Sequence, residues 1–178
     1  MRGDSYLMHN ITLETDRLIL RPLTVADAEA VFAWASDPNV NRYLKYPLHT
    51  DVEVTRQWLR SVEQKTGGYD FGFVRKSDGL LIGSGGVYDN GDGSWELGYN
   101  LRHDCWNQGY TTEAAKAMLA FAHRELGVKV FVSSHAVDNP ASGRVMEKCG
   151  LTFHHCGEYS KKDGSETFPA KYYRLELP

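Results

Sequence analysis

The 178-residue chain has the length of one ordinary domain, and we expect a single domain over residues 1–178 with an ordered core over about residues 12–178. With 42% hydrophobic and 24% charged residues and no apolar run of about 20, the composition excludes a disordered chain or a membrane-spanning helix. The formal net charge of -3 gives no bulk attraction for nucleic acid or an acidic membrane, so neither is expected as a partner.

The first half of the chain predicts one strand, two helices and three more strands. Residues 17–21 alternate in polarity and predict a strand that Pro22 ends. The segment Thr24–Asp27 resembles a helix capping box and predicts a helix over about 24–36. A second capping box at Thr50–Glu53 predicts a helix over about 50–65. Glycine-containing turns then separate three predicted strands: Asp70–Arg75, Leu80–Tyr88 and Ser94–Leu101.

The second half alternates helices and strands less regularly. Apolar residues at helical spacing predict a helix over about 112–126, with Gly127 as its stop. A strand over 129–136 and a helix over 140–149 follow, and the last two strands cover about 152–159 and 168–177. The order β-α-α-β-β-β-α-β-α-β-β indicates a mixed α/β domain, not a doubly wound nucleotide-binding fold.

The segment Trp95–Glu113 reads as a strand, a turn containing Gly109 and the start of a helix. A glycine lets the backbone approach a ligand closely, and the free N–H groups and positive dipole of a helix N-terminus attract a diphosphate. The segment contains neither the P-loop pattern nor the dinucleotide pattern G-x-G-x-x-G. A glycine before a helix is often only a turn, so both interpretations stay open on this segment alone.

Four blocks taken together resemble a known family. They stand in the order and at the separations found in the GNAT superfamily of N-acetyltransferases, in particular its RimJ/RimL-like branch of ribosomal-protein N-terminal acetyltransferases. These blocks are Glu14–Pro22 (ETDRLILRP), Trp95–Tyr99 (WELGY), Trp106–Ala114 (WNQGYTTEA) and Asn139–Leu151 (NPASGRVMEKCGL). The resemblance implies a GNAT acyl-CoA N-acyltransferase fold of about seven strands and four helices.

The resemblance also implies an enzyme that transfers an acetyl group from acetyl-CoA to a primary amine, by direct attack in a ternary complex. Its acceptor would be a protein N-terminal α-amine or a small-molecule amine. In the family, acetyl-CoA occupies the opening between two diverging strands. The residues matched to its binding site are Tyr99, Asn100 and Leu101 for the pantetheine arm, Asn107, Gln108, Gly109, Tyr110, Thr111 and Thr112 for the diphosphate, and Asn139 and Ser142.

Three positions depart from the superfamily pattern. Trp106 and Thr111 fill the first and last places of the usual Q/R-x-x-G-x-G/A loop, and Thr111 adds bulk near the phosphates. Met146 stands where many members carry a tyrosine that protonates the departing thiolate. A thioether cannot donate a proton, which leaves the acid open.

Glu96 and Ser142 are the candidate catalytic residues. On an alternating strand Glu96 shares a face with Gly98, which leaves space for a substrate, so Glu96 is the candidate base. Ser142 is the candidate acid, because similar enzymes place a serine there. The competing interpretations are a solvent-facing glutamate and a serine that bonds to its own helix backbone.

Two other functions are compatible with these sequence features. A non-catalytic acyl-CoA-binding sensor or interaction module is the principal alternative, and a nucleotide-binding domain is another. We expect no metal site, because His103–Cys105 and His154–Cys156 lack zinc-site spacing and neighbouring strand residues point to opposite faces. Three cysteines in no disulfide pattern, and no apolar leader in residues 1–10, predict a cytoplasmic protein. The resemblance implies a monomer or a homodimer, because similar enzymes are often dimers.

Overall fold

The structure is a computed structural model that describes residues 10–178. The expectation about a leader in residues 1–10 therefore falls almost wholly outside the described part of the chain. Over residues 10–178 eight strands form one sheet in the order β1-β2-β3-β4-β5-β6-β8-β7. Within this range no helix combines the length and apolar character needed to cross a membrane.

The elements have the following bounds. The strands are β1 (Leu13–Glu14), β2 (Leu18–Arg21), β3 (Gly68–Arg75), β4 (Leu81–Asp89), β5 (Ser94–Leu101), β6 (Val130–Ala136), β7 (Thr152–Ser160) and β8 (Thr167–Glu176). The helices are α1 (Ala28–Ala35), α2 (Pro38–Asn41), α3 (Val52–Glu63), α4 (Tyr110–Leu126) and α5 (Pro140–Lys148). The β5–β6 pair is parallel, and the other neighbouring strands are antiparallel.

Two short elements, β1 and α2, were not predicted from the sequence. β1 is a two-residue strand that pairs with β2, too short for any periodicity to mark it. Asp37-Pro38 does end α1, but it also opens α2, because the Asp37 carboxylate accepts a hydrogen bond from the Asn39 N–H at 2.9 Å. Asp51, not Thr50, caps α3, and the first box opens a 3-10 turn over Val25–Asp27 ahead of α1.

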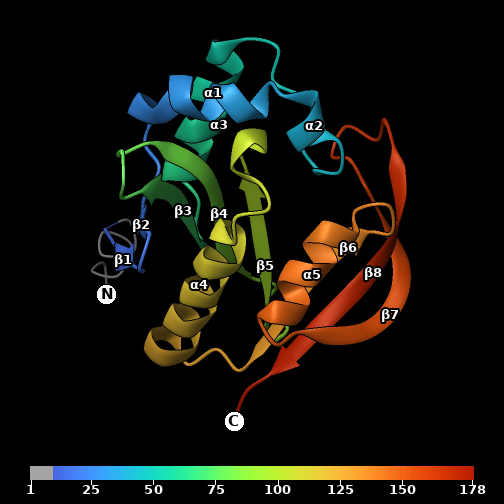
Figure 1. The fold of residues 1–178 in the computed structure, drawn as a ribbon. Coiled ribbons are helices and arrows are strands. Elements are labelled where there is room, and N and C mark those ends of the chain that lie inside the picture. The colour runs from blue at the N-terminus through green and yellow to red at the C-terminus, as the bar shows by residue number, and fades with distance from the viewer. Residues whose placement is uncertain (1–9) are drawn as a thin grey trace.

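Helices cover both faces of the sheet (Figure 1). Consecutive residues of β4 show this, because Leu81 belongs to the cluster under α1 and α3 whereas Ile82 belongs to the cluster under α4. α5 lies on the α4 side, where Met146 packs into the main core with 1% of its surface exposed. The β7–β8 hairpin extends the sheet beyond α5, and β7 is its exposed edge.

The β5–β6 ladder stops early, which opens the sheet near its middle. β5 has eight residues, but only Ser94, Trp95 and Glu96 pair with β6, the last rung being Glu96 with Val132. At the next position the Ser133 hydroxyl donates to the Leu97 carbonyl at 2.8 Å, where a backbone bond would otherwise continue the ladder. Beyond that point the two strands diverge, and α4 and α5 flank the gap (Figure 1).

Close contact between α5 and β6 fixes one side of this gap. The His135 ring lies against Gly143, where an ideal Cβ would stand 2.5 Å from Nε2. Nδ1 donates a hydrogen bond to the Ala136 carbonyl at 2.7 Å, which fixes the orientation of the ring. Nε2 has no hydrogen-bond partner among the described residues, and the helix can sit this close only because position 143 has no side chain.

We predict that Gly143→Ala lowers the free energy of unfolding by about 1–3 kcal/mol, because the added methyl group pushes α5 away from the buried ring. Urea unfolding monitored by circular dichroism measures this. The matched control is Lys148→Ala on the exposed face of the same helix, which should change stability by less than about 0.5 kcal/mol. Equal stability of Gly143→Ala and the wild type would show that this contact does not set the helix position.

Candidate active site

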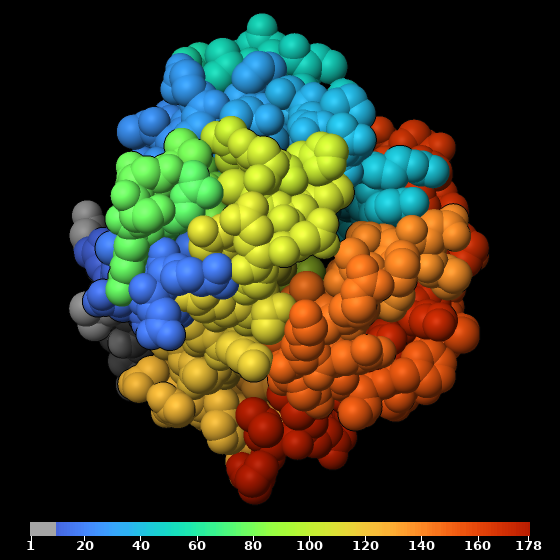
Figure 2. All heavy atoms as spheres, in the orientation of Figure 1, coloured from blue at the N-terminus to red at the C-terminus, as the bar shows by residue number. Residues whose placement is uncertain are grey.

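A cavity of about 750 Å³ lies where β5 and β6 diverge, between α2, the Trp106–Thr112 loop and the start of α5. The space-filling view shows the hollow between the segment following β5 and the first turns of α5 (Figure 2). Ten of the predicted cofactor-site residues line it: Tyr99, Asn100, Leu101, Asn107, Gly109, Tyr110, Thr111, Thr112, Asn139 and Ser142. Gln108 is the exception, since its side chain turns back to the Asp104 carbonyl at 3.3 Å.

The loop before α4 lines this cavity from Trp106 to the first residues of the helix. Asn107 has φ of 60° and Gly109 has φ of 82°, so the chain takes two left-handed steps before the helix begins at Tyr110. The positive φ of Asn107 could not be inferred from its residue type, although asparagine tolerates it. Glu113 N–H bonds to the Gly109 carbonyl, while the leading amides of a helix have no partner within it. Such amides at a positive dipole end suit an anion.

Arg17 of the first motif block supports this loop, a link that sequence reasoning missed. Its guanidinium donates to the Gln108 carbonyl at 2.9 Å and to the Glu113 carboxylate at 2.8 Å, and it lies 4.2 Å from the centre of the Tyr110 ring. An ideal Cβ at Gly109 would stand 3.3 Å from Arg17 Nη2, so the glycine also admits this arginine. Arg17 and Glu113 are 96 positions apart in the sequence, and their contact joins the first and third motif blocks into one structural unit.

Glu113 is the centre of that unit. Its carboxylate accepts from Thr15 Oγ1 at 2.6 Å and from both the backbone and the side chain of Arg17. Burial alone would raise the pKa of Glu113, but these hydrogen bonds outweigh it and hold the pKa below its usual value. The carboxylate consequently stays ionised at neutral pH and keeps the loop joined to the start of β2.

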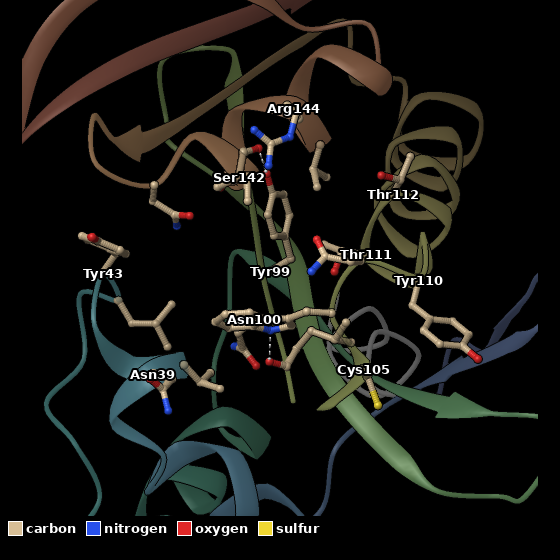
Figure 3. Close-up of a pocket in the computed structure, with 18 of the residues that line it drawn as sticks. Asn39, Tyr43, Tyr99, Asn100, Cys105, Tyr110, Thr111, Thr112, Ser142 and Arg144 are labelled. Carbon is tan, nitrogen blue, oxygen red and sulfur yellow. Dashed lines mark hydrogen bonds between the residues drawn. The ribbon is translucent and has the colours of Figure 1, made fainter. Parts of the chain in front are cut away.

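Tyr99 and Ser142 form a pair of hydroxyl groups inside the cavity (Figure 3). Tyr99 Oη donates to the Ser142 carbonyl at 2.8 Å and lies 3.2 Å from Ser142 Oγ. Burial raises the pKa of Tyr99 above its usual value, so the phenol keeps its proton. Met146, at the position of the family's usual tyrosine, is buried in the core and does not line the cavity. The Tyr99 hydroxyl was not anticipated, because only its backbone was matched to the family.

The N-terminal end of α5 contributes polar and basic groups. Asn139 is the N-cap residue, yet its side chain makes no capping hydrogen bond, which leaves it available to a ligand. Arg144 and Lys148, one turn apart, also line the cavity and bring positive charge to it. Basic side chains next to free helix amides suit a ligand that carries several phosphates.

Glu96 lies on the opposite face of β5, at the last rung shared with β6. Trp95, Leu97 and Tyr99 pack toward the main core, which confirms the predicted alternation of faces. Lys45 Nζ is 3.0 Å from Glu96 Oε1, and the two side chains are 42% and 38% exposed. An ideal Cβ at Gly98 would meet only the Tyr88 ring, at 3.6 Å, so there is room beside the carboxylate.

The prediction that neighbouring histidines of the strand point to opposite faces was wrong. A bulge between Phe153 and His155 breaks the alternation of β7, so His154 Nδ1 and His155 Nδ1 lie 2.8 Å apart instead of on opposite faces. Residues 10–178 nevertheless hold no group of three or more side chains that could ligate a metal ion.

The open sheet, the loop before α4 and the cavity between them have the arrangement that the resemblance to acyl-CoA N-acyltransferases implies. A family model described as an acetyltransferase (GNAT) domain matches residues 17–152, and the chain belongs to this GNAT acetyltransferase family. It is 31% identical over 144 residues to the uncharacterized N-acetyltransferase YoaA of Bacillus subtilis strain 168, covering 78% of this chain and 81% of YoaA. The predicted GNAT fold and N-acetyltransferase class are thereby confirmed.

Solved structures agree with this assignment. A GNAT-family acetyltransferase from Bacillus anthracis superimposes with a TM-score of 0.82 at 26% identity, covering 93% of this chain and 98% of that one. RimL, a ribosomal L7/L12 α-N-protein acetyltransferase in complex with coenzyme A, gives a TM-score of 0.80 at 18% identity, covering 94% and 98%. The second likeness is one of fold alone.

We predict that Arg17→Ala raises the dissociation constant for acetyl-CoA about three- to tenfold, because the loop amides lose their support. Calorimetric titration measures it. Arg174→Ala is the matched control, since it removes a similar arginine–carboxylate pair within β8, and it should leave the dissociation constant unchanged. Unaltered affinity in Arg17→Ala would contradict the supporting role of this arginine.

Proposed function

We propose that this GNAT protein transfers the acetyl group of acetyl-CoA to a primary amine by direct attack, with Glu96 as the base. One observation carries the proposal: the β5–β6 ladder ends at Glu96, so this residue is the last paired one before the two strands part, and the cavity lined by Tyr99 lies on the other face of β5. The donor and the acceptor can thus meet at this point from opposite faces of the sheet.

Residues of this chain fit acetyl-CoA. Tyr99, Asn100 and Leu101 lie on the part of β5 that has left the ladder with β6, so their backbone groups can accept an extended arm. The amides from Asn107 to Thr112, with Arg144 and Lys148, provide donors and positive charge for phosphates. The thioester supplies the activated acetyl group, and the protein's part is to hold it, to take a proton and to return one.

The amine gives a proton to Glu96 on one face of the sheet, and the departing sulfur takes up a different proton on the other face. The Tyr99–Ser142 pair supports this second step, because its hydroxyls lie inside the cavity. Burial raises the pKa of Tyr99, so the phenol keeps the one proton that it donates to the Ser142 carbonyl. The Ser142 hydroxyl is then the group that gives a proton to the sulfur, and it regains one from solvent. These hydroxyls can supply the proton that Met146 cannot donate, and the methionine at that position was the reason for considering a non-catalytic sensor.

Direct transfer is favoured over an acetyl-enzyme formed on Cys149. Burial raises the pKa of the Cys149 thiol to about 11, so it stays protonated at neutral pH. Its Sγ lies 3.9 Å from the Thr112 carbonyl within the packing between α4 and α5. A buried, protonated thiol is a poor nucleophile, and this supports attack by the amine itself.

The acceptor we favour is an α-amine, either a protein N-terminus, as in the RimJ/RimL-like branch, or a small molecule. Neutralising a lysine-like amine at pH 7 costs roughly 4–5 kcal/mol, whereas an α-amine with a pKa near 8 needs only about 1 kcal/mol. Glu96 is partly exposed and already engaged by Lys45, so an acceptor that needs little help from the base fits it best.

The test is release of the coenzyme A thiol in the presence of a serine-ended peptide, an amino acid, a polyamine and an aminoglycoside. We expect turnover with one of the two α-amines. Glu96→Gln should lower kcat about a hundredfold or more, with the affinity for acetyl-CoA retained. Glu158→Gln on exposed β7 is the matched control and should keep wild-type kcat. Cofactor binding without thiol release from any amine would instead indicate a sensor.

For the hydroxyl pair we predict that Tyr99→Phe and Ser142→Ala each lower kcat about tenfold, since each removes one member of the same hydrogen-bonded unit. Because the two act together, the double variant should be little worse than either single one. Steady-state thiol release measures all three. Wild-type turnover in Ser142→Ala would remove this residue from the mechanism.

A further inference from the structure

Lys45 brings a primary amine of the chain itself to the candidate base. Its Nζ lies 3.0 Å from Glu96 Oε1, within hydrogen-bond distance. Glu96 is the last residue of β5 that pairs with β6, so this amine stands where the two strands begin to diverge. That is the place where the proposed reaction needs an acceptor amine.

The backbone around Lys45 is held firmly by the β7–β8 hairpin. Lys162 N–H donates to the Lys45 carbonyl at 2.7 Å, Lys161 Nζ to the Leu44 carbonyl at 2.9 Å, and Tyr159 Oη to the Tyr43 carbonyl at 2.6 Å. The two residues before Lys45 also line the cavity. The segment is therefore anchored next to the opening, while the Lys45 side chain stays 42% exposed and able to move.

We propose that Lys45 is a self-acetylation site of this enzyme, an inference that rests on the proposed function. The Nζ gives one proton to Glu96 and attacks the thioester carbon of acetyl-CoA, and its fixed place beside the base offsets the larger cost of neutralising a lysine amine. A nitrogen–carbon bond forms as the carbon–sulfur bond breaks. The attacking nitrogen releases its second proton, and the sulfur takes up a proton and leaves as the coenzyme A thiol. Acetyl-CoA supplies the acetyl group, so no other reactant is needed.

The modification has a consequence for turnover. An acetylated Lys45 is neutral, and it loses its ion pair with Glu96. The added acetyl group also stays beside the carboxylate, in the space that an external amine has to enter. Self-acetylation would therefore restrain the transfer of acetyl groups to other amines.

Peptide mass spectrometry of the full chain after incubation with acetyl-CoA tests the proposal. Lys116 and Lys171 are exposed lysines of the same molecule and report non-enzymatic acetylation. We expect Lys45 to be acetylated more than about tenfold faster than either, because proximity raises the effective concentration of the two reactants. The rate should not depend on protein concentration, since the reaction lies within one molecule.

Two further measurements separate this reaction from ordinary exposure. Glu96→Gln, with folding checked by its melting curve, should reduce the Lys45 rate to that of Lys116. An excess of free coenzyme A, which competes for the same opening, should slow Lys45 and leave Lys116 unchanged. Acetylation of Lys45 no faster than that of Lys116, or an undiminished Lys45 rate in Glu96→Gln, would overturn the proposal.

Thiol release with the amine panel, measured on the same preparation, distinguishes the two possible failures. Turnover of an external amine with an unmodified Lys45 would overturn self-acetylation alone. Neither turnover nor binding of acetyl-CoA would overturn the proposed function and the self-acetylation with it. Acetylated Lys45 without turnover of the panel would support the inference and show that the right acceptor was missing.

Discussion

The site depends on one interruption, the end of backbone pairing between β5 and β6 at Glu96 and Val132. Had the ladder continued, the edge of β5 that carries Tyr99 would be filled by β6 and the sheet would have no opening. The Ser133 hydroxyl bonds to the Leu97 carbonyl at the first unpaired position, so the interruption leaves that buried carbonyl satisfied. The helices α4 and α5, packed on the same face, then hold the two halves of the sheet apart as walls of the cavity (Figure 1).

A second constraint joins the start of the chain to the phosphate side of the cavity. Glu113 near the start of α4 receives hydrogen bonds from Thr15 and Arg17, and Arg17 also reaches the carbonyl of Gln108. The left-handed backbone conformations of Asn107 and Gly109 set the direction of the loop, and the hydrogen bonds of Arg17 and Glu113 hold the loop in that conformation. The N-terminal block of the family pattern is thus part of the site, although it lines none of the cavity.

Local patterns predicted the fold well because strand alternation, helix caps and glycine turns act over a few residues. Ser94–Leu101 was predicted with its observed bounds, and the family resemblance located the opening beside it. The sequence could not reveal partners brought together by folding: Arg17 with Gln108, Tyr99 with Ser142, and Lys45 with Glu96. A bulge likewise cannot be read from alternation, which is why the premise about His154 and His155 was wrong.

Hydrogen–deuterium exchange with and without acetyl-CoA tests the central claim most directly, since it reports on the backbone amides themselves. The account predicts slower exchange at Tyr99–Leu101 and at Asn107–Thr112 when acetyl-CoA is present, with exposed β7 unchanged as an internal reference. Unaltered exchange in both segments, or protection confined to another face of the sheet, would contradict it.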